Sequence, residues 1–167
     1  RAPDWIAQRA RYHADTDLTG ADFATLLADL TADDQRLAIS AEAYERVVIW
    51  MEHDSHDQLA LVRCLAQYAK TRPPHVLELI SVNHFPGSRR FIGLGQLPPE
   101  AMRLFWPRRE RLGPSHLALG AEAWNGLTAD DPRALATLMR AGTPALPHLA
   151  PALHRHLREL PSKATGL

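Results

Sequence analysis

A short run of acidic and imidazole side chains is the part of this sequence best suited to chemistry. Glu52, His53, Asp54 and Asp57 lie close together along the chain. A carboxylate beside an imidazole can act as a general acid–base pair, and the same groups can ligate a divalent metal. We therefore take these four residues as the candidate catalytic residues, with a divalent metal as an open alternative.

A second set of polar residues is suited to binding an anion. Ser55 and Gln58 match the Ser-x-x-Gln box that starts a helix, where free backbone N–H groups attract phosphate. Asn83, Arg89 and Arg90 follow later in the chain, and guanidinium groups bind phosphate well. We expect these five residues to contact a small anionic ligand.

Two strands and one helix must position these side chains. Residues 47–51 form a continuous β-branched and aromatic run, typical of a strand covered on both faces. Helical spacing follows over residues 59–69, and residues 75–82 again suggest a strand. The order strand, helix, strand predicts an α/β fold, with a small parallel, Rossmann-like sheet built around a βαβ unit. Both polar segments would then meet beyond the carboxyl ends of the strands, where ligands bind in such sheets.

The pattern also suggests two domains. Residues 1–97 would form the α/β domain, and residues 98–167, where prolines introduce successive helices, a helical C-terminal domain. Two strands alone do not make a stable sheet. We therefore expect the α/β domain to be incomplete at its N-terminus, or its sheet to be covered by a partner such as a second copy of the chain.

Composition excludes some classes of protein. The 167 residues include 19 basic and 19 acidic side chains, so no net charge attracts nucleic acid or a membrane. Trp106 with neighbouring arginines offers only weak support for a nucleic-acid patch, which Glu110 interrupts. No apolar run approaches the roughly 20 residues of a membrane helix. A single cysteine, Cys64, and no visible signal peptide favour the cytoplasm.

Structural roles compete with these functional ones. Ser55 and Asp57 could serve only to cap a helix, and Glu52 could form an ion pair with Arg46, Arg89 or Arg90. Three hypotheses remain open. The chain could be an enzyme acting on a phosphorylated or nucleotide-like ligand, or a non-catalytic regulatory or interaction module. In the third, the Glu-His-Asp cluster is a buried polar network that only holds the turn of the βαβ unit together.

Several motifs are similar to a bacterial family known only as domain of unknown function 1835. They are Val47 to Asp54 with Asp57-Gln58-Leu59, Leu77 to Ser81, Phe85-Pro86-Gly87 and Phe91 to Leu97. The helical tail resembles the companion domain usually found with that family. The resemblance implies a strand with a Gly-Asp-Ser turn before these residues and further helices after them. It implies no activity. An aromatic residue is more usual at the position of His56, and an aspartate at that of Asn83.

Overall fold

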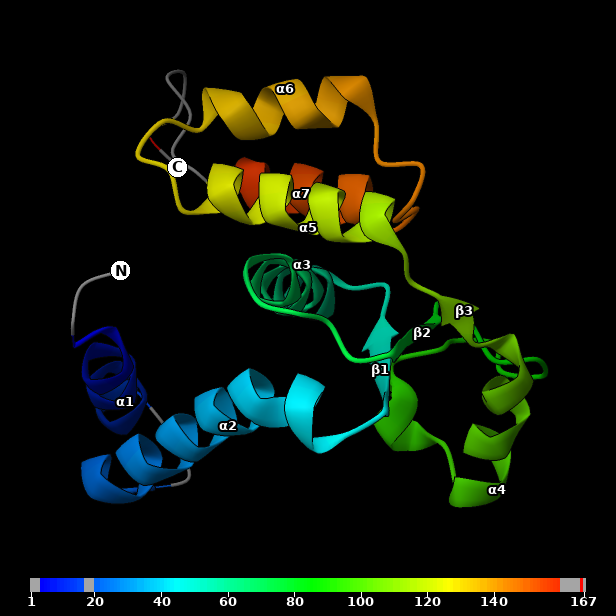
Figure 1. Cartoon of the computed structure of the whole chain (residues 1–167), viewed down its shortest axis with the longest axis horizontal. Coiled ribbons are helices and arrows are strands. Elements are labelled where there is room, and N and C mark those ends of the chain that lie inside the picture. Colours follow the sequence, from blue (N-terminus) through cyan, green and yellow to red (C-terminus); the bar gives the residue numbers. More distant parts are fainter. Residues whose placement is uncertain (1–3, 17–19, 160–165, 167) are drawn as a thin grey trace. The chain divides into compact units, whose positions relative to one another are not determined.

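The chain divides into two compact units in the computed structural model, which describes residues 4–16, 20–159 and 166. The first unit is Arg1–Ala43 and the second is Tyr44–Leu167 (Figure 1). The first unit holds α1 (Trp5–Thr16) and α2 (Phe23–Ala43), which pack against each other. Asp22 caps α2, because its carboxylate accepts a hydrogen bond of 3.0 Å from the Thr25 N–H.

The second unit begins with a strand, a helix and a second strand, and continues mainly as helices. Its elements are β1 (Arg46–Glu52), α3 (Ser55–Lys70), β2 (Val76–Val82), η1 (Leu94–Gln96), α4 (Pro99–Met102), η2 (Arg103–Arg108), β3 (Glu110–Arg111), α5 (Pro114–Leu127), α6 (Arg133–Ala141) and α7 (Leu149–Arg158). The boundary predicted near residue 97 falls inside this unit. No helix in the described part of the chain is long and apolar enough to cross a bilayer.

The sheet has the strand order β1-β2-β3 and is mixed. β1 pairs with β2 in parallel, from Arg46 opposite Val76 to Glu52 opposite Val82. β3 pairs with β2 antiparallel, with Glu110 opposite Leu79. β1 is therefore an edge strand among the described residues, and β2 is the central one.

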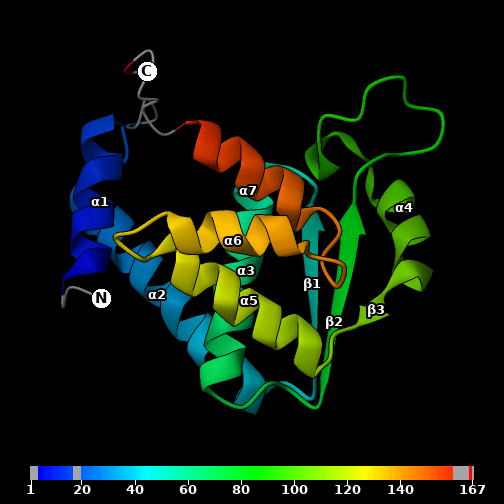
Figure 2. The same cartoon turned by 90° about the horizontal axis from the view of Figure 1, so that it is seen from above.

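Helices cover one face of this sheet in layers. α3 packs against β1 and against both α5 and α7, and α6 lies on the outside of α5 and α7 (Figures 1 and 2). The buried face of α3 includes Leu61, Val62 and Leu65, with helical spacing. α5 approaches α3 closely at Gly120, where an added Cβ would lie 2.3 Å from the Leu65 Cβ. A glycine is therefore needed at this helix crossing.

The other face of the sheet is covered by irregular chain. Ile80 and Val82 of β2 form a buried cluster with Phe105 of η2. Val48 and Trp50 of β1 pack against that cluster, together with four apolar residues of the segment between β2 and α4, namely Phe85, Phe91, Leu94 and Leu97. The long segment after β2 thus serves as one wall of the core.

The predicted fold class is wrong. The chain is mostly helical, with seven α-helices in its described part and only a small three-stranded mixed sheet, and not a Rossmann-like parallel sheet. The two strands expected over residues 47–51 and 75–82 are present. The third strand was missed because Glu110 and Arg111 are both charged and exposed, so their pairing leaves no apolar pattern in the sequence.

Candidate functional site

Glu52 ends β1 and holds the segment after β2 in place. Its Oε1 accepts a hydrogen bond of 2.6 Å from the Leu94 N–H, and an added Cβ at Gly93 would lie 2.7 Å from its Oε2. The carboxylate is half-buried against this backbone. Glu52 therefore acts in the structure as an anchor between two distant segments, and its ion pair with Arg46, Arg89 or Arg90 does not form: Arg46 instead pairs with Glu78 at 2.7 Å.

Asp54, Asp57 and Gln58 close the turn between β1 and α3. Asp54 is the helix cap, because its Oδ1 accepts a hydrogen bond of 2.9 Å from the Asp57 N–H. The Asp57 Oδ2 accepts one of 2.6 Å from the Glu52 N–H, and the Gln58 amide donates one of 2.7 Å to the Glu52 carbonyl. Both backbone polar groups of Glu52 are thus satisfied by side chains of α3.

The cap lies one residue earlier than the sequence motif suggested. Ser55 is the first residue of α3 and is half-buried, while Asp54 precedes it in an extended conformation. His53 and His56 are exposed. The ring of His53 lies edge-on to that of His148, with 6.2 Å between their centroids. His53 therefore faces a part of the chain far away in sequence, as Glu52 does through Leu94.

The predicted residues after β2 are all exposed. Asn83 Oδ1 lies 2.7 Å from His84 Nδ1, and Arg89 and Arg90 lie in the segment that leads to η1. Neither arginine lines a described cavity beside the 52–58 turn. The expected clustering of Arg89 and Arg90 with the acidic turn therefore stays a prediction.

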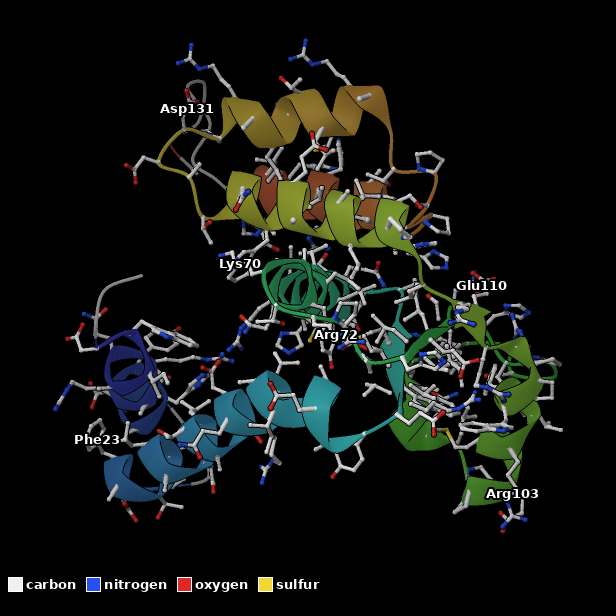
Figure 3. All side chains as sticks on the ribbon, in the orientation of Figure 1. Phe23, Lys70, Arg72, Arg103, Glu110 and Asp131 are labelled. Atoms are coloured by element: carbon white, nitrogen blue, oxygen red, sulfur yellow. The ribbon has the colours of Figure 1, made fainter. Side chains whose placement is uncertain are left out.

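A polar cavity lies instead between β2, β3 and the helical layer. Its volume is about 190 Å³, and its apolar wall includes Leu61, Leu79 and Leu146. Its polar residues are Gln58, Ser81, Asn83, Arg108, Glu110, His116 and His148. We refer to it as the two-histidine cavity. Figure 3 shows Glu110 at one end of the segment that begins at Arg103. A shallower depression of about 400 Å³ shares Ser81, Arg108 and Glu110 with it.

The two histidines of this cavity have different surroundings. His116 Nδ1 accepts a hydrogen bond of 3.0 Å from the Gly113 N–H, so the proton of the neutral ring lies on Nε2. Burial lowers the pKa of His148 below its ordinary 6.5, and the nearby His53 lowers it further. His148 is therefore mainly neutral at pH 7.

The arginines of the segment before β3 have different environments. Arg109 lies over the Trp106 ring, with 4.1 Å from its Cζ to the ring centroid, and its Nε is 3.3 Å from the Glu78 carboxylate. Arg108 lies over the Phe105 ring at 5.4 Å and lines the cavity with its charge exposed. Of the arginines that suggested a nucleic-acid patch with Trp106, Arg109 is thus engaged with that ring.

Among the described residues, no three His, Cys, Asp or Glu side chains are grouped as a metal site would need. Cys64 is half-buried, and burial raises the pKa of its thiol. The divalent metal therefore stays a prediction without a set of ligands in this part of the chain.

No family model, no curated protein and no solved structure matches this chain. The resemblance to domain of unknown function 1835 accordingly stays a prediction.

Sequence reasoning found Gln58 and Asn83 of the two-histidine cavity and missed Arg108, His116 and His148. Arg108 was visible only as one of several arginines near Trp106, and His148 has no spacing typical of a ligand. The Pro114-Ser115-His116 sequence does carry one signal, since a polar side chain at the third helical position can reach back to the cap backbone.

Proposed function

We propose that the chain binds the anionic group of a small phosphorylated or nucleotide-like ligand in the two-histidine cavity. The observation that carries the proposal is the hydrogen bond from the Gly113 N–H to His116 Nδ1. It leaves Nε2–H as a fixed donor of a residue that lines the same cavity as the Arg108 guanidinium. The amide of Asn83 and the hydroxyl of Ser81 add further donors.

Glu110 makes the cavity suitable for a ligand with two chemical parts. Its carboxylate would repel a bare anion but would accept hydrogen bonds from hydroxyl groups, as acidic residues do with ribose. An anionic group near Arg108 and a hydroxyl-bearing group near Glu110 would satisfy both charges. A nucleotide or sugar phosphate has this combination of groups.

A role in catalysis is a second candidate, favoured by the contact between His53 and His148. His148 is neutral near pH 7 because its pKa is lowered, so it could accept a proton from a bound ligand. The carboxylates of Glu52, Asp54 and Asp57 already accept backbone hydrogen bonds. The histidines would therefore carry out the proton transfer. Binding of a ligand without turnover would instead indicate a regulatory module.

The proposal places the chain in the cytoplasm, where nucleotides are abundant and Cys64 would stay reduced. Membership of the family of unknown function 1835 is compatible with it but supplies no activity.

Calorimetric titration with inorganic pyrophosphate and with ADP tests the binding proposal. Arg108→Gln should weaken binding by about tenfold or more, since a charge-assisted hydrogen bond contributes about 1.5–3 kcal/mol. Arg103→Gln is the matched control, because both arginines are exposed on η2 and Arg103 does not line the cavity (Figure 3). No binding by the natural chain, or an equal loss in both variants, would refute the proposal.

Phosphate release from ADP and pyrophosphate tests the catalytic candidate. His148→Asn should then abolish turnover with little change in affinity. If the chain binds these ligands but turns over no screened phosphate ester, the catalytic candidate is excluded and the regulatory role remains.

A further inference from the structure

The open edge of β1 differs from the rest of the sheet in its exposure. β1 is apolar over residues 47–51, yet none of its side chains is buried, whereas β2 buries Leu77, Leu79, Ile80 and Val82. No other strand of the described chain pairs with its second edge. An apolar edge strand with unpaired backbone groups is a template for pairing with another strand.

The backbone groups that face this open edge can be assigned. The Val76 N–H donates a hydrogen bond of 2.9 Å to the Glu45 carbonyl, so that carbonyl points toward β2. Because successive residues of a strand alternate, the polar backbone groups of Ile49 also point toward β2. Those of Val48 and Trp50 then point to the open edge, and so does the Glu52 N–H, which Asp57 caps.

We propose that a second copy of this chain occupies the edge, with β1 pairing antiparallel to β1 about Ile49. In this register Ile49 lies opposite itself, and Val48 lies opposite Trp50. The pairs Val48–Trp50 and Trp50–Val48 then exchange backbone hydrogen bonds across the interface, which their outward-pointing groups allow. The result is a continuous six-stranded sheet made from two three-stranded ones.

Charge complementarity within β1 favours this occupant and this register. The strand reads Arg-Val-Val-Ile-Trp-Met-Glu, with a cation at one end, an anion at the other and only apolar residues between them. Antiparallel pairing about Ile49 places Arg46 of each copy, which also pairs with Glu78 of its own chain, opposite Glu52 of the other, while every inner position meets an apolar residue. A parallel pairing in register would place like charges together at both ends.

Sedimentation of the full chain over a range of concentrations tests the pairing. The natural chain should form dimers, and Val48→Pro should weaken dimerisation by about tenfold or more, because two interface hydrogen bonds are lost. Val48→Ala is the matched control, since it shortens the same side chain but keeps the N–H. Dimerisation should survive in this control. Arg46→Glu should likewise weaken the dimer more than Arg46→Gln does.

A cross-linking experiment tests the register independently of how well the proline variant folds. Non-hydrogen-bonded antiparallel pairs have Cα atoms about 4.5 Å apart, which a disulfide can span. Ile49→Cys should therefore form an interchain disulfide on mild oxidation much faster than Val47→Cys, which would face Met51 instead. A monomer without such preferential cross-linking, or a dimer that Val48→Pro leaves intact, would overturn the proposal.

Discussion

Replacing Asp57 by alanine should destabilise the unit Tyr44–Leu167 without changing its affinity for a ligand in the two-histidine cavity. The Asp57 Oδ2 accepts the Glu52 N–H at 2.6 Å, and alanine would leave that half-buried donor without a partner. A hydrogen bond to a charged group contributes about 1.5–3 kcal/mol. An acidic residue in the first helical turn adds about 0.3–1 kcal/mol. We therefore expect the free energy of unfolding to fall by about 2–4 kcal/mol.

Urea unfolding followed by far-ultraviolet circular dichroism measures this loss. Asp57→Asn is the matched control, because it keeps an oxygen acceptor while removing the charge, and it should cost about 1 kcal/mol. Hydrogen exchange of the Glu52 amide should accelerate in Asp57→Ala. Pyrophosphate affinity should be unchanged in both variants. Unchanged stability together with lost pyrophosphate binding would refute a structural role for this carboxylate and restore its functional one.

Three further outcomes follow from the packing and the charges. Gly120→Ala should lower the free energy of unfolding by about 1–3 kcal/mol, because its Cβ would lie 2.3 Å from the Leu65 Cβ, whereas Gly95→Ala, which meets open space, should change it little. The pKa of His148 is lowered in the folded chain, so the unfolded chain binds a proton more readily. The free energy of unfolding should therefore fall as the pH drops below 6.5. Urea unfolding of His148→Asn should show a smaller fall over the same pH range. Protonation of His148 also adds positive charge to the cavity, so sulfate, which stays a dianion, should bind more tightly as the pH falls from 7.5, and calorimetry should show a smaller gain in His148→Asn.

The local elements could be predicted where the apolar pattern is strong. Residues 47–51 are a continuous apolar run and residues 75–82 are largely apolar, and both segments contain strands in the structure. β3 could not be predicted, since two exposed charged residues carry no strand pattern and pair with β2 only through tertiary contact. The short antiparallel strand β3 and the helical layer over α3 distinguish this sheet from the Rossmann-like sheet that was expected.

The candidate site was located only in part, for a reason of topology. Gln58 and Asn83 could be selected because they follow strands near one sheet edge. Arg108, His116 and His148 come from three later elements that the sequence does not place beside that edge. Only packing of α5 and α7 on α3 brings these histidines to the end of β2. Residue types at a strand end therefore indicated the neighbourhood of the cavity but not its cationic side.

The acidic turn shows why charged residues at a strand end are weak evidence for catalysis. A half-buried strand terminus leaves backbone N–H and C=O groups that need partners, and the short side chains of Asp57 and Gln58 supply them at Glu52. A catalytic carboxylate needs a free oxygen beside an open space. By that criterion Glu52 is an anchor for Leu94, whereas Asp54 is exposed and its catalytic role stays a prediction. The acidic turn would then support the cavity indirectly, because Gln58 belongs both to the turn and to the cavity wall.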